Sequence, residues 1–458
     1  MNIASIWLGG LALVAASGFA PIRGQEHPGQ PAPPAAAAVA RADLGGEPLK
    51  LTLAGALKRA LAANPDLGVA RLEVAAARAQ KDIAVSAVLP HLSATGNYLR
   101  NTVESAFDFN GTQVLLLPRN DWNYKLTLTQ PIFAGNRDRK ALSQARLGIQ
   151  SAEQEAGSFE EQLLLAVVSD YLGILQGQEL LDVEKLNLAL TQERRTLAQN
   201  LFEAGESTRV DTLRAEADIK AVERRVADAQ RMRDEAESRL RLDLALERPL
   251  AVAEPAALFP PLADEAALVA AAERQRPEVI EAEIALASAK LEVDKQRGAY
   301  YPVLSAEGDF LSQRSSFPAD RYGQLALKLT VPIYQGGETA GRVALARERQ
   351  RQAELRLDAA RRTVREEVRR SFIDLASAEA SQRLARDQLA ASEAEYRQAA
   401  DLYRAQETTS LDEQSAENSL ADARRAVATS KLDRQLAELR VWAAAGMLKQ
   451  TVLEENAR

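Results

Sequence analysis

Two long stretches of the chain carry apolar residues at helical spacing among Glu, Gln, Arg and Asp residues. In the first stretch, the spaced apolar residues are Leu163, Val167, Tyr171, Ile174 and Leu181. In the second stretch, they are Val364, Val368, Phe372 and Leu375, followed later by Leu432, Leu436 and Leu439. Residues three, four or seven positions apart lie on one face of an α-helix. The spacing therefore predicts amphipathic helices with narrow apolar stripes.

The positions of proline limit where these helices can run, because proline breaks or kinks the interior of a helix. No proline occurs between Pro131 and Pro249, and none follows Pro332. The first proline-free interval has room for an unbroken helix from about residue 141 to residue 202. Such a helix is roughly 90 Å long at 1.5 Å per residue, which is too long for a globular core.

Each proline-free interval contains one plausible break, at residues 202–208 and at residues 403–409. Gly205 suits the end of the preceding helix, because glycine readily adopts the left-handed conformation found there. Residues Ser410 to Glu413 have the form of a capping box, in which a hydroxyl and a carboxylate satisfy free amides at a helix start. Each interval is therefore predicted to form an antiparallel helical hairpin.

Four other segments alternate apolar and polar residues with a period of two, which is typical of β-strands exposed on one face. These segments are residues 92–100, 122–129, 304–312 and 324–331. In the third segment, Glu307 and Asp309 share one face, and Lys328 lies on the matching fourth segment. Charged side chains on a strand face indicate that this face contacts water.

The aromatic residues gather near these strand segments. Twelve of the 22 aromatic residues lie within residues 90–135 and 299–335. This concentration fits the aromatic girdles of a membrane interface, although strand cores also favour aromatic residues. Four strands cannot close a membrane barrel, which needs at least about eight. If the strands span a membrane, the chain must therefore oligomerise.

The whole pattern occurs twice along the chain. Asn64-Pro65 recurs 212 positions later as Arg276-Pro277, and Leu89-Pro90 recurs as Tyr301-Pro302. Further on the offset is 201, which relates residues 131–135 to 332–336, Tyr171 to Phe372 and Asp211 to Asp412. A single length difference of 11 residues, between positions 90 and 131 of the first copy, accounts for the change of offset.

The constant offsets predict a tandem repeat of about 200 residues, well above the range of solenoid repeats. We assign residues 49–250 to the first repeat, residues 251–448 to the second, and residues 449–458 to a C-terminal tail. One elongated unit with two pseudo-equivalent halves replaces the three domains that a length of 458 residues suggests by itself.

The N-terminus is predicted to be a secretory signal over residues 1–20. Residues 3–20 form one apolar stretch that ends in Gly18-Phe19-Ala20, which resembles a cleavage site. No Lys or Arg precedes Ile6, so the alternative of a buried helix stays open. Residues 21–48 are rich in Pro, Ala, Gln and Gly and have too few large apolar residues to pack a core. We interpret them as a flexible leader.

Composition excludes several classes of function. Lys and Arg total 57 and Asp and Glu total 64, and the resulting net charge of −7 leaves no basic stripe for nucleic acid. The chain contains no cysteine, which excludes disulfides, thiolate zinc sites and lipid attachment to an N-terminal cysteine. After the N-terminus, no run approaches the roughly 20 apolar residues of a membrane-spanning helix, whereas a membrane β-barrel stays open.

The chain carries no visible catalytic or cofactor chemistry. His27 and His91 are its two histidines, and His91 has no companion ligands for a metal site. We find no GxSxG motif, P-loop or paired-glycine fingerprint. An enzyme is therefore disfavoured, and neither a metal nor a cofactor is expected.

Taken together, these features resemble the TolC-like outer-membrane efflux factor family. The strand-to-helix joints at residues 130–135 and 331–336 and the hairpin tip at residues 204–213 carry the resemblance, which covers about residues 49–448. It implies a mainly α-helical protomer of a homotrimer, in which four strands per chain form a twelve-stranded outer-membrane β-barrel. Twelve helices would continue the barrel as a long periplasmic tunnel.

The resemblance also implies a function. Members of the family act as passive exit ducts of tripartite drug-efflux or type I secretion systems, and no cofactor is implied. Their helical tips dock onto a periplasmic adaptor protein, which connects them to an inner-membrane pump. In this chain the expected docking residues are Gly205, Glu206, Ser207, Thr208, Thr409 and Ser410.

Several residues match gating positions of the family. Asp412 matches an acidic residue that forms a cation-selective ring at the periplasmic entrance. A second acidic position of that ring is Ser415 here, with Glu413 close by. Tyr403 and Asp211 match two residues of the latch that holds the entrance closed.

The arginine of that latch corresponds to Thr408 in this chain. Its salt bridge is therefore expected to be absent or replaced, with Arg404 and Arg209 as the candidates. Asp412 and Asp211 also have a simpler interpretation, because a carboxylate at the start of a helix is stabilised by the helix dipole.

An alternative function stays open at this point. A secreted periplasmic coiled-coil scaffold, with the strands packed as a small soluble sheet, has the same helical pattern. The sequence also does not separate drug efflux from protein secretion or metal efflux.

Overall fold

The structure is a computed structural model that describes residues 49–455, with gaps at residue 110, residues 255–258, residues 315–318 and residue 406. All of these residues belong to the compact unit Leu44–Arg458. The predicted signal and leader, residues 1–48, lie outside the described residues.

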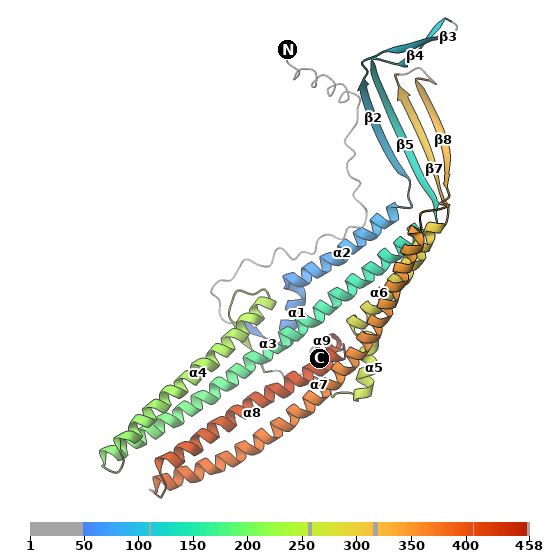
Figure 1. Ribbon diagram of the computed structural model, residues 1–458. Coiled ribbons are helices and arrows are strands. Elements are labelled where there is room, and N and C mark those ends of the chain that lie inside the picture. Colours follow the sequence, from blue (N-terminus) through green and yellow to red (C-terminus); the bar gives the residue numbers. More distant parts are fainter. Residues whose placement is uncertain (1–48, 110, 255–258, 315–318, 406, 456–458) are drawn as a thin grey trace, which may run out of the picture. The chain divides into compact units, whose positions relative to one another are not determined.

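Two similar series of elements follow one another along the chain (Figure 1). The first series is β1 (Leu49–Leu51), α1 (Leu53–Ala63), α2 (Pro65–Ser86), β2 (His91–Arg100), β3 (Ser105–Phe109), β4 (Thr112–Leu117), β5 (Asn120–Ala134), α3 (Arg137–Glu203) and α4 (Arg209–Asp243). The second is β6 (Leu250–Val252), α5 (Glu265–Gln275), α6 (Pro277–Arg297), the 3-10 turn η3 (Gly298–Tyr300), β7 (Val303–Gln313), β8 (Arg321–Thr330), α7 (Glu338–Arg404), α8 (Ser410–Ala444) and α9 (Leu448–Glu455).

The long helices of the two series have equal lengths. Helices α3 and α7 have 67 residues each, and α4 and α8 have 35 residues each. At 1.5 Å per residue, α3 and α7 are about 100 Å long. Both proline-free intervals break where the sequence predicts a break, so α3 with α4 and α7 with α8 form two antiparallel hairpins. Among the described residues, none of the helices is both long and apolar enough to cross a membrane.

Four strands form one antiparallel sheet in the order β2-β5-β7-β8. His91 lies opposite Thr129 in the first copy, and Val303 lies opposite Thr330 in the second. These two pairs are related by the same offsets of 212 and 201 that relate the sequences, since 91 + 212 = 303 and 129 + 201 = 330. The two copies therefore share their strand register as well as their order.

The length difference between the copies lies in the connection between their two strands. In the first copy, β3 and β4 pair as an antiparallel hairpin inserted between β2 and β5. In the second copy, only residues 314–320 separate β7 from β8. The extra residues of the first copy thus belong to the stretch that forms the β3–β4 hairpin.

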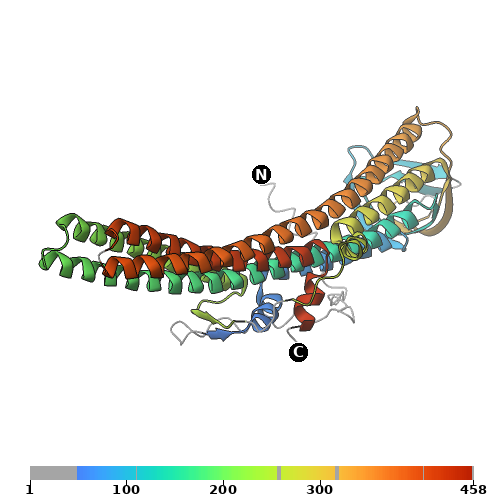
Figure 2. The same cartoon turned by 90° about the horizontal axis from the view of Figure 1, so that it is seen from below.

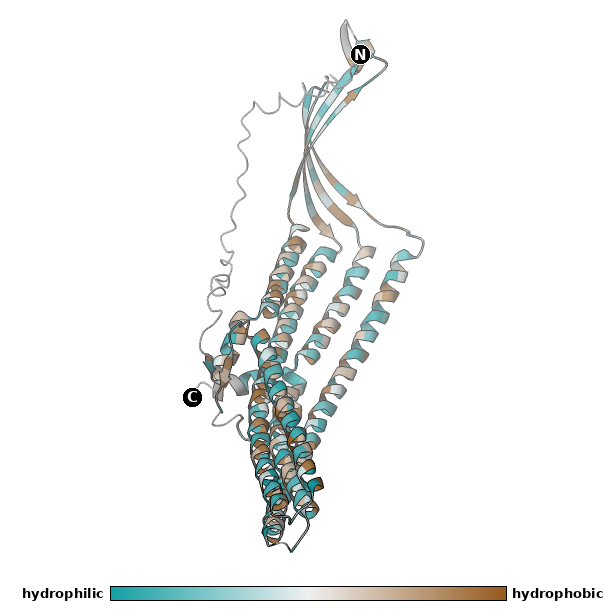
Figure 3. Ribbon diagram, turned by 90° about the vertical axis from the view of Figure 1, so that its left-hand side faces the viewer, coloured by the Kyte–Doolittle hydropathy of each residue, from teal (hydrophilic) through white to brown (hydrophobic). Residues whose placement is uncertain are grey.

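Hydrophilic and hydrophobic residues alternate along the strands of the four-stranded sheet (Figure 3), so its two faces differ in polarity. On one face, Lys125 Nζ lies 2.8 Å from Asp309 Oδ2, and Thr127 Oγ1 donates a hydrogen bond of 2.8 Å to Asp309 Oδ1. The other face carries large apolar side chains that are exposed in the single chain: Leu92, Tyr98, Tyr124, Leu126, Leu128, Phe310, Leu325, Leu327 and Leu329. The sheet thus has a charged, hydrogen-bonded face and an uncovered apolar face.

Glycine allows the close turn from strand to helix at each joint. Gly135 has φ +64 and Gly336 has φ +60, a left-handed backbone conformation that residues other than glycine rarely adopt. A Cβ added to Gly298 would lie 2.4 Å from the carbonyl oxygen of Gly135. Neither Gly135 nor Gly298 therefore tolerates a side chain at this contact between the copies.

The main apolar core lies at the middle of α3, where α1, α5, α9 and the short strands gather (Figure 2). β1 and β6 pair in parallel, which joins the starts of the two copies. Tyr171 of α3 is fully buried here, and its hydroxyl lies 3.1 Å from the carbonyl oxygen of Leu51 and 2.5 Å from that of Ala253, to which it donates its one hydrogen. The same hydroxyl accepts a hydrogen bond of 3.1 Å from the Ala253 amide.

The Tyr171 hydroxyl is expected to contribute measurably to stability. Tyr171→Phe removes the hydrogen bonds that this hydroxyl makes with the carbonyl and amide of Ala253, which costs about 1 kcal/mol for each bond lost. Thermal unfolding of the detergent-solubilised protein measures the loss. Tyr396→Phe serves as the control, because no hydrogen bond of the Tyr396 hydroxyl is recorded among the described residues. Equal melting temperatures for the two variants contradict the prediction.

Candidate functional site at the hairpin tips

The first hairpin turns through a glycine cap at the end of α3. Gly205 has φ +77, the Glu206 amide donates to the Leu201 carbonyl at 2.8 Å, and the Gly205 amide donates to the Phe202 carbonyl at 3.0 Å. These two bonds form the Schellman motif, which satisfies carbonyls left free at a helix end. The sequence-based role of Gly205 as a helix stop agrees with this geometry.

Both returning helices begin with a capping box. Thr208 and Asp211 form the box of α4, and Thr409 and Asp412 form that of α8. The predicted box began one residue too late, because Ser410 is already the first helical residue and its capping partner is not Glu413. Three consecutive hydroxyl residues precede Asp412, and each of them suits an N-cap.

Asp412 is an exposed carboxylate that caps its own helix. Its Oδ2 accepts hydrogen bonds from Thr409 Oγ1 at 2.6 Å, Thr408 Oγ1 at 2.8 Å and the Thr409 amide at 3.2 Å. The hydrogen bonds from Thr409 and Thr408 lower the pKa of Asp412. The simpler interpretation of Asp412 as a helix-start carboxylate therefore holds, and it leaves Oδ1 available for a second role.

Asp211, the counterpart of Asp412, joins the two hairpins. Its Oδ2 accepts from Thr208 Oγ1 at 2.7 Å and Ser207 Oγ at 3.0 Å, whereas its Oδ1 accepts from Ser410 Oγ at 2.8 Å. Burial alone would raise the pKa of Asp211, but hydrogen bonds from Thr208, Ser410 and Ser207 outweigh it and lower the pKa to about 2. Asp211 thus stays ionised and holds the start of α8.

Of the other predicted latch residues, Tyr403 lines the same small cavity as Asp211 and Ser410, whereas Arg404 pairs within its own helix. Arg404 Nη1 lies 3.4 Å from Asp401 Oδ1 on its own helix, and both side chains are exposed. Tyr403 is buried, with burial as the main cause that raises its pKa and the charges of Glu413 and Asp211 adding to it. Ser410, rather than Arg404, makes the cross-hairpin contact with Asp211.

Glu413 lies between the hairpins and not on the exposed tip. It is 6% exposed in the single chain, and its Oε2 has no hydrogen-bond partner among the described residues. Burial raises the pKa of Glu413 to about 7, with Arg194 and Arg404 lowering it and Glu417 raising it. Glu413 is therefore a buried carboxyl that gains or loses its proton near neutral pH.

A charged network beside Glu413 holds the two hairpins together below the tips. Arg194 of α3 contacts Asp218 of α4 and, through Nε at 3.1 Å, Glu417 Oε2 of α8. Thr191 Oγ1 donates to Glu417 Oε1 at 2.6 Å, and Gln414 Nε2 donates to Asp218 Oδ2 at 2.6 Å. The network spans three helices, and sequence reasoning did not identify any of its members.

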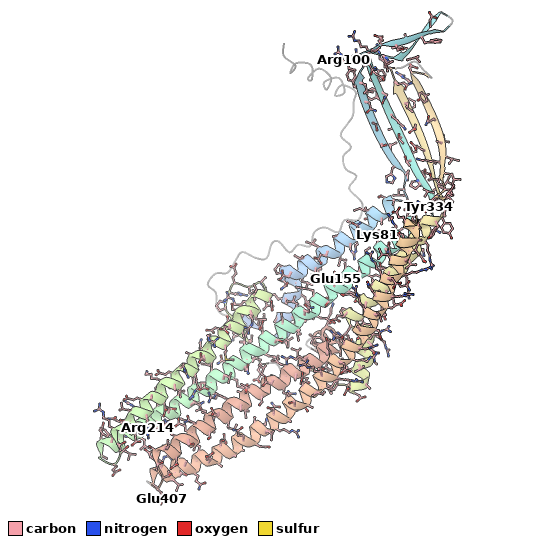
Figure 4. The ribbon with its side chains drawn as sticks, in the orientation of Figure 1. Lys81, Arg100, Glu155, Arg214, Tyr334 and Glu407 are labelled. Atoms are coloured by element: carbon pink, nitrogen blue, oxygen red, sulfur yellow. The ribbon has the colours of Figure 1, made fainter. Side chains whose placement is uncertain are left out.

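A second buried carboxylate repeats this arrangement further from the tips. Glu184 of α3 lies 3.3 Å from Nε of Arg225 on α4 and 3.5 Å from Nε of Arg425 on α8. Its side chain is almost fully buried. In each cluster, a charged residue of α3 contacts both α4, the other helix of its own hairpin, and α8 of the second hairpin. Figure 4 labels Arg214 and Glu407 near the two tips.

Known proteins share this architecture. The profile of the family described as "Outer membrane efflux protein" matches residues 56–245 and 268–447, one segment in each copy. The chain belongs to the outer membrane efflux protein family. It is therefore an outer-membrane transport duct with a helical periplasmic part, as predicted, and the family favours the duct over the periplasmic scaffold.

Individual relatives agree with the family. Outer membrane efflux protein BepC of Brucella suis biovar 1 is 24% identical over 381 residues, which cover 81% of this chain and 80% of BepC. Alkaline protease secretion protein AprF of Pseudomonas aeruginosa is 28% identical over 345 residues, which cover 71% of this chain and 69% of AprF. The CmeC outer membrane channel of Campylobacter jejuni has the same fold, with a TM-score of 0.74, 18% identity and 88% of each chain covered.

Proposed function

We propose that three copies of this chain assemble into the exit duct of a tripartite efflux or type I secretion system. The observation that carries the proposal is the sheet. Its apolar face is uncovered in the single chain, its other face is charged, and β2 and β8 each have one paired neighbour in the described sheet. An edge strand presents unpaired amides and carbonyls, so an open sheet of this kind calls for further strands.

The internal pairing of β5 with β7 supplies the geometry of the next contact. β5 is the second strand of the first copy, and β7 is the first strand of the second copy. One further step of the same kind pairs β8 with β2 of another chain. The offset of 201 relates residues of β5 to β8, and the offset of 212 relates residues of β2 to β7. Lys328 is therefore expected opposite Asn97, as Thr127 lies opposite Asp309. In the same way, Leu327 is expected opposite Tyr98, as Leu126 lies opposite Phe310.

This register keeps the two faces of the sheet continuous. Lys328 and Asn97 are polar, whereas Leu327 and Tyr98 both belong to the exposed apolar face. Three chains then give twelve strands, which exceeds the roughly eight needed to close a barrel. The apolar face meets lipid, and the face with Lys125 and Asp309 lines the lumen.

The long hairpins extend the duct into the periplasm, where their tips meet the adaptor of an inner-membrane pump. The proposed docking residues are Gly205, Glu206, Ser207, Thr208, Thr409 and Ser410. Asp412 faces the entrance and favours the passage of cations, because three copies of its carboxylate lie around one constriction. The duct itself is passive.

Because the chain has no cysteine, the strand register can be tested by site-directed cross-linking. Lys328→Cys combined with Asn97→Cys is expected to give disulfide-linked trimers on non-reducing gels. Lys328→Cys combined with Ser93→Cys is the matched control, because four residues along a strand separate the thiols by about 13 Å. Native mass analysis and bilayer conductance accompany the test. A monomer that conducts no ions, or equal cross-linking of both pairs, contradicts the proposal.

A further inference from the structure

Three arginines lie on the apolar face of the four-stranded sheet, at the end that points away from the helices: Arg100, Arg314 and Arg321. Figure 4 labels Arg100 at this end of β2. Side chains alternate between the two faces of a strand, so Arg100 shares the face of Tyr98 and Arg321 shares that of Leu325. All three arginines are exposed, and no hydrogen bond or ion pair of their side chains is recorded among the described residues. Their charges are therefore available to a ligand.

Arg314 and Arg321 are close enough to bind one ligand together. Arg314 directly follows β7, and its amide donates a hydrogen bond of 2.9 Å to the Trp122 carbonyl, which continues the register of β7. Ser312 lies opposite Arg321. Arg314 is thus a diagonal neighbour of Arg321 at a distance of about 7–8 Å, which long side chains span. Both guanidinium groups can therefore contact the same anion.

Acidic and basic residues face opposite sides at this end of the sheet. Asp121 shares the face of Lys125, and Asp320, directly before β8, shares that of Asp309. Within strands β2, β5, β7 and β8, no Asp or Glu lies on the apolar face. In the proposed barrel, the acidic groups therefore face the lumen and the arginines face outwards.

The aromatic residues below Arg100 give its level in the membrane. Tyr98 lies opposite Trp122, and the Trp122 ring lies 5.4 Å from that of Tyr124. The Tyr98 hydroxyl donates a hydrogen bond of 3.1 Å to Asn120 Oδ1. Tyr and Trp side chains of this kind gather at the border between hydrocarbon and headgroups. Arg100 follows Tyr98 toward the outer end of β2, so its guanidinium lies at the level of the headgroups.

The length of the apolar face along β8 gives the same level for Arg321. Arg321 and Val331 both belong to this face and lie ten positions apart, which is about 34 Å along the strand. At a strand tilt of about 40°, this span covers about 26 Å of membrane, close to the roughly 25 Å of an outer-membrane apolar band. Leu325, Leu327 and Leu329 lie between the two ends and are exposed. Arg321 therefore marks the outer border of the band.

We propose that Arg314 and Arg321, with Arg100 on the same rim, bind the phosphate groups of a lipid in the outer leaflet, an inference that rests on the proposed barrel. A guanidinium group binds phosphate through parallel hydrogen bonds, and clusters of basic residues at a membrane surface recognise anionic headgroups. Lipid A, the glycolipid of the outer leaflet, carries its phosphates directly above its acyl chains. The arginines take the phosphates, and the acyl chains lie along Leu325 and Leu327.

The step between chains brings a third arginine toward each site. Tyr124 lies opposite Ser312 within the chain. The offsets of 201 and 212 therefore place Leu325 opposite Arg100 of the next chain. Arg321 lies four residues further along β8, at about 13 Å, so one lipid with two phosphates can contact both arginines. The bound lipid thus bridges two chains of the barrel.

Native mass analysis of the full-length detergent-solubilised protein tests the site, with diphosphorylated lipid A as the probe. An arginine near anionic headgroups contributes about fivefold to binding, so Arg321→Gln is expected to weaken binding to the trimer about fivefold. Arg314→Gln combined with Arg321→Gln is expected to weaken it about 25-fold. Lipid A without its phosphates is expected to bind the parent trimer at least about 25-fold more weakly. Lys328→Gln is the matched control, because it removes the same charge from the opposite face of β8 and is expected to leave binding unchanged.

The outcomes separate this inference from the proposed function. A monomer on native mass analysis overturns the trimeric barrel itself. Trimers that bind lipid A equally with and without its phosphates, or that lose binding equally in Arg321→Gln and Lys328→Gln, overturn the lipid site alone. Inorganic phosphate at the concentration of the lipid is not expected to compete, because it has no acyl chains. Displacement of lipid A by inorganic phosphate shows that the arginines bind phosphate alone, and it overturns the lipid as the ligand.

Discussion

Replacing Arg194 by methionine is expected to destabilise the contact between the two hairpins of one chain by about 3–5 kcal/mol. The Arg194 side chain is 10% exposed and contacts both Asp218 and Glu417. Without the guanidinium, the buried Glu417 carboxylate keeps the Thr191 hydroxyl as its partner and has no compensating charge. The loss of a partner from a buried ion pair costs far more than the pair contributes, because the remaining charge stays desolvated.

Hydrogen exchange of α3 and α8 near the tips, measured on the detergent-solubilised protein, reports this local loss without requiring global unfolding. Arg195→Met is the matched control, since the neighbouring Arg195 lies 3.6 Å from Glu216 with both side chains exposed. An exposed pair contributes at most about 1 kcal/mol. If Arg194→Met and Arg195→Met change exchange to the same extent, the buried network does not hold the hairpins together.

The sequence predicted the long helices and the four-stranded pattern because both depend on local rules. Proline positions limit helices wherever they occur, and the alternation of apolar and polar residues is visible along each strand. The β3–β4 hairpin was not predicted, although Asn110-Gly111 is a common signal for a tight turn. Only the length difference between the copies indicated that something was inserted there.

The candidate site was predictable only in part. Asp211, Tyr403 and Asp412 were identified by their matching positions, but the partners of their side chains were not. Arg194 and Glu417 are separated by 223 positions, since 417 − 194 = 223, and both lie in strongly polar stretches typical of an exposed helix surface. Their pairing depends on how α3 and α8 align, and no local pattern encodes that alignment.

Replacing Glu413 by glutamine is expected to stabilise the tip region at neutral and alkaline pH. Burial raises the pKa of Glu413 to about 7 from its ordinary value of 4.5. Between about pH 4.5 and pH 7, the folded state therefore keeps a proton on Glu413 that the unfolded state releases. The stability that depends on Glu413 is complete below about pH 4.5 and is lost as the pH rises through about 7.

The size of the effect follows from the same shift. The pKa of Glu413 rises from 4.5 to about 7 on folding, and at 1.36 kcal/mol per pKa unit this rise corresponds to roughly 3 kcal/mol of folding free energy. Glutamine keeps the shape and does not ionise, so Glu413→Gln is more stable than the parent above pH 7 and equal to it below pH 4.5. Thermal unfolding at a series of pH values measures the difference, with the exposed Glu407→Gln as the control. A constant difference across the pH range contradicts the assignment to ionisation.

Glu413 and Arg194 are also expected to be coupled, because the Arg194 charge lowers the pKa that burial raises. Removing Arg194 therefore makes ionised Glu413 more costly, and the gain from Glu413→Gln should be larger in the Arg194→Met background than in the parent. A double-mutant cycle at pH 8 isolates this coupling from the loss of the Glu417 contact, since Glu417 is unchanged in both arms. If the two changes are additive at pH 8, the Arg194 charge does not act on Glu413, and burial rather than Arg194 sets the pKa of this carboxyl.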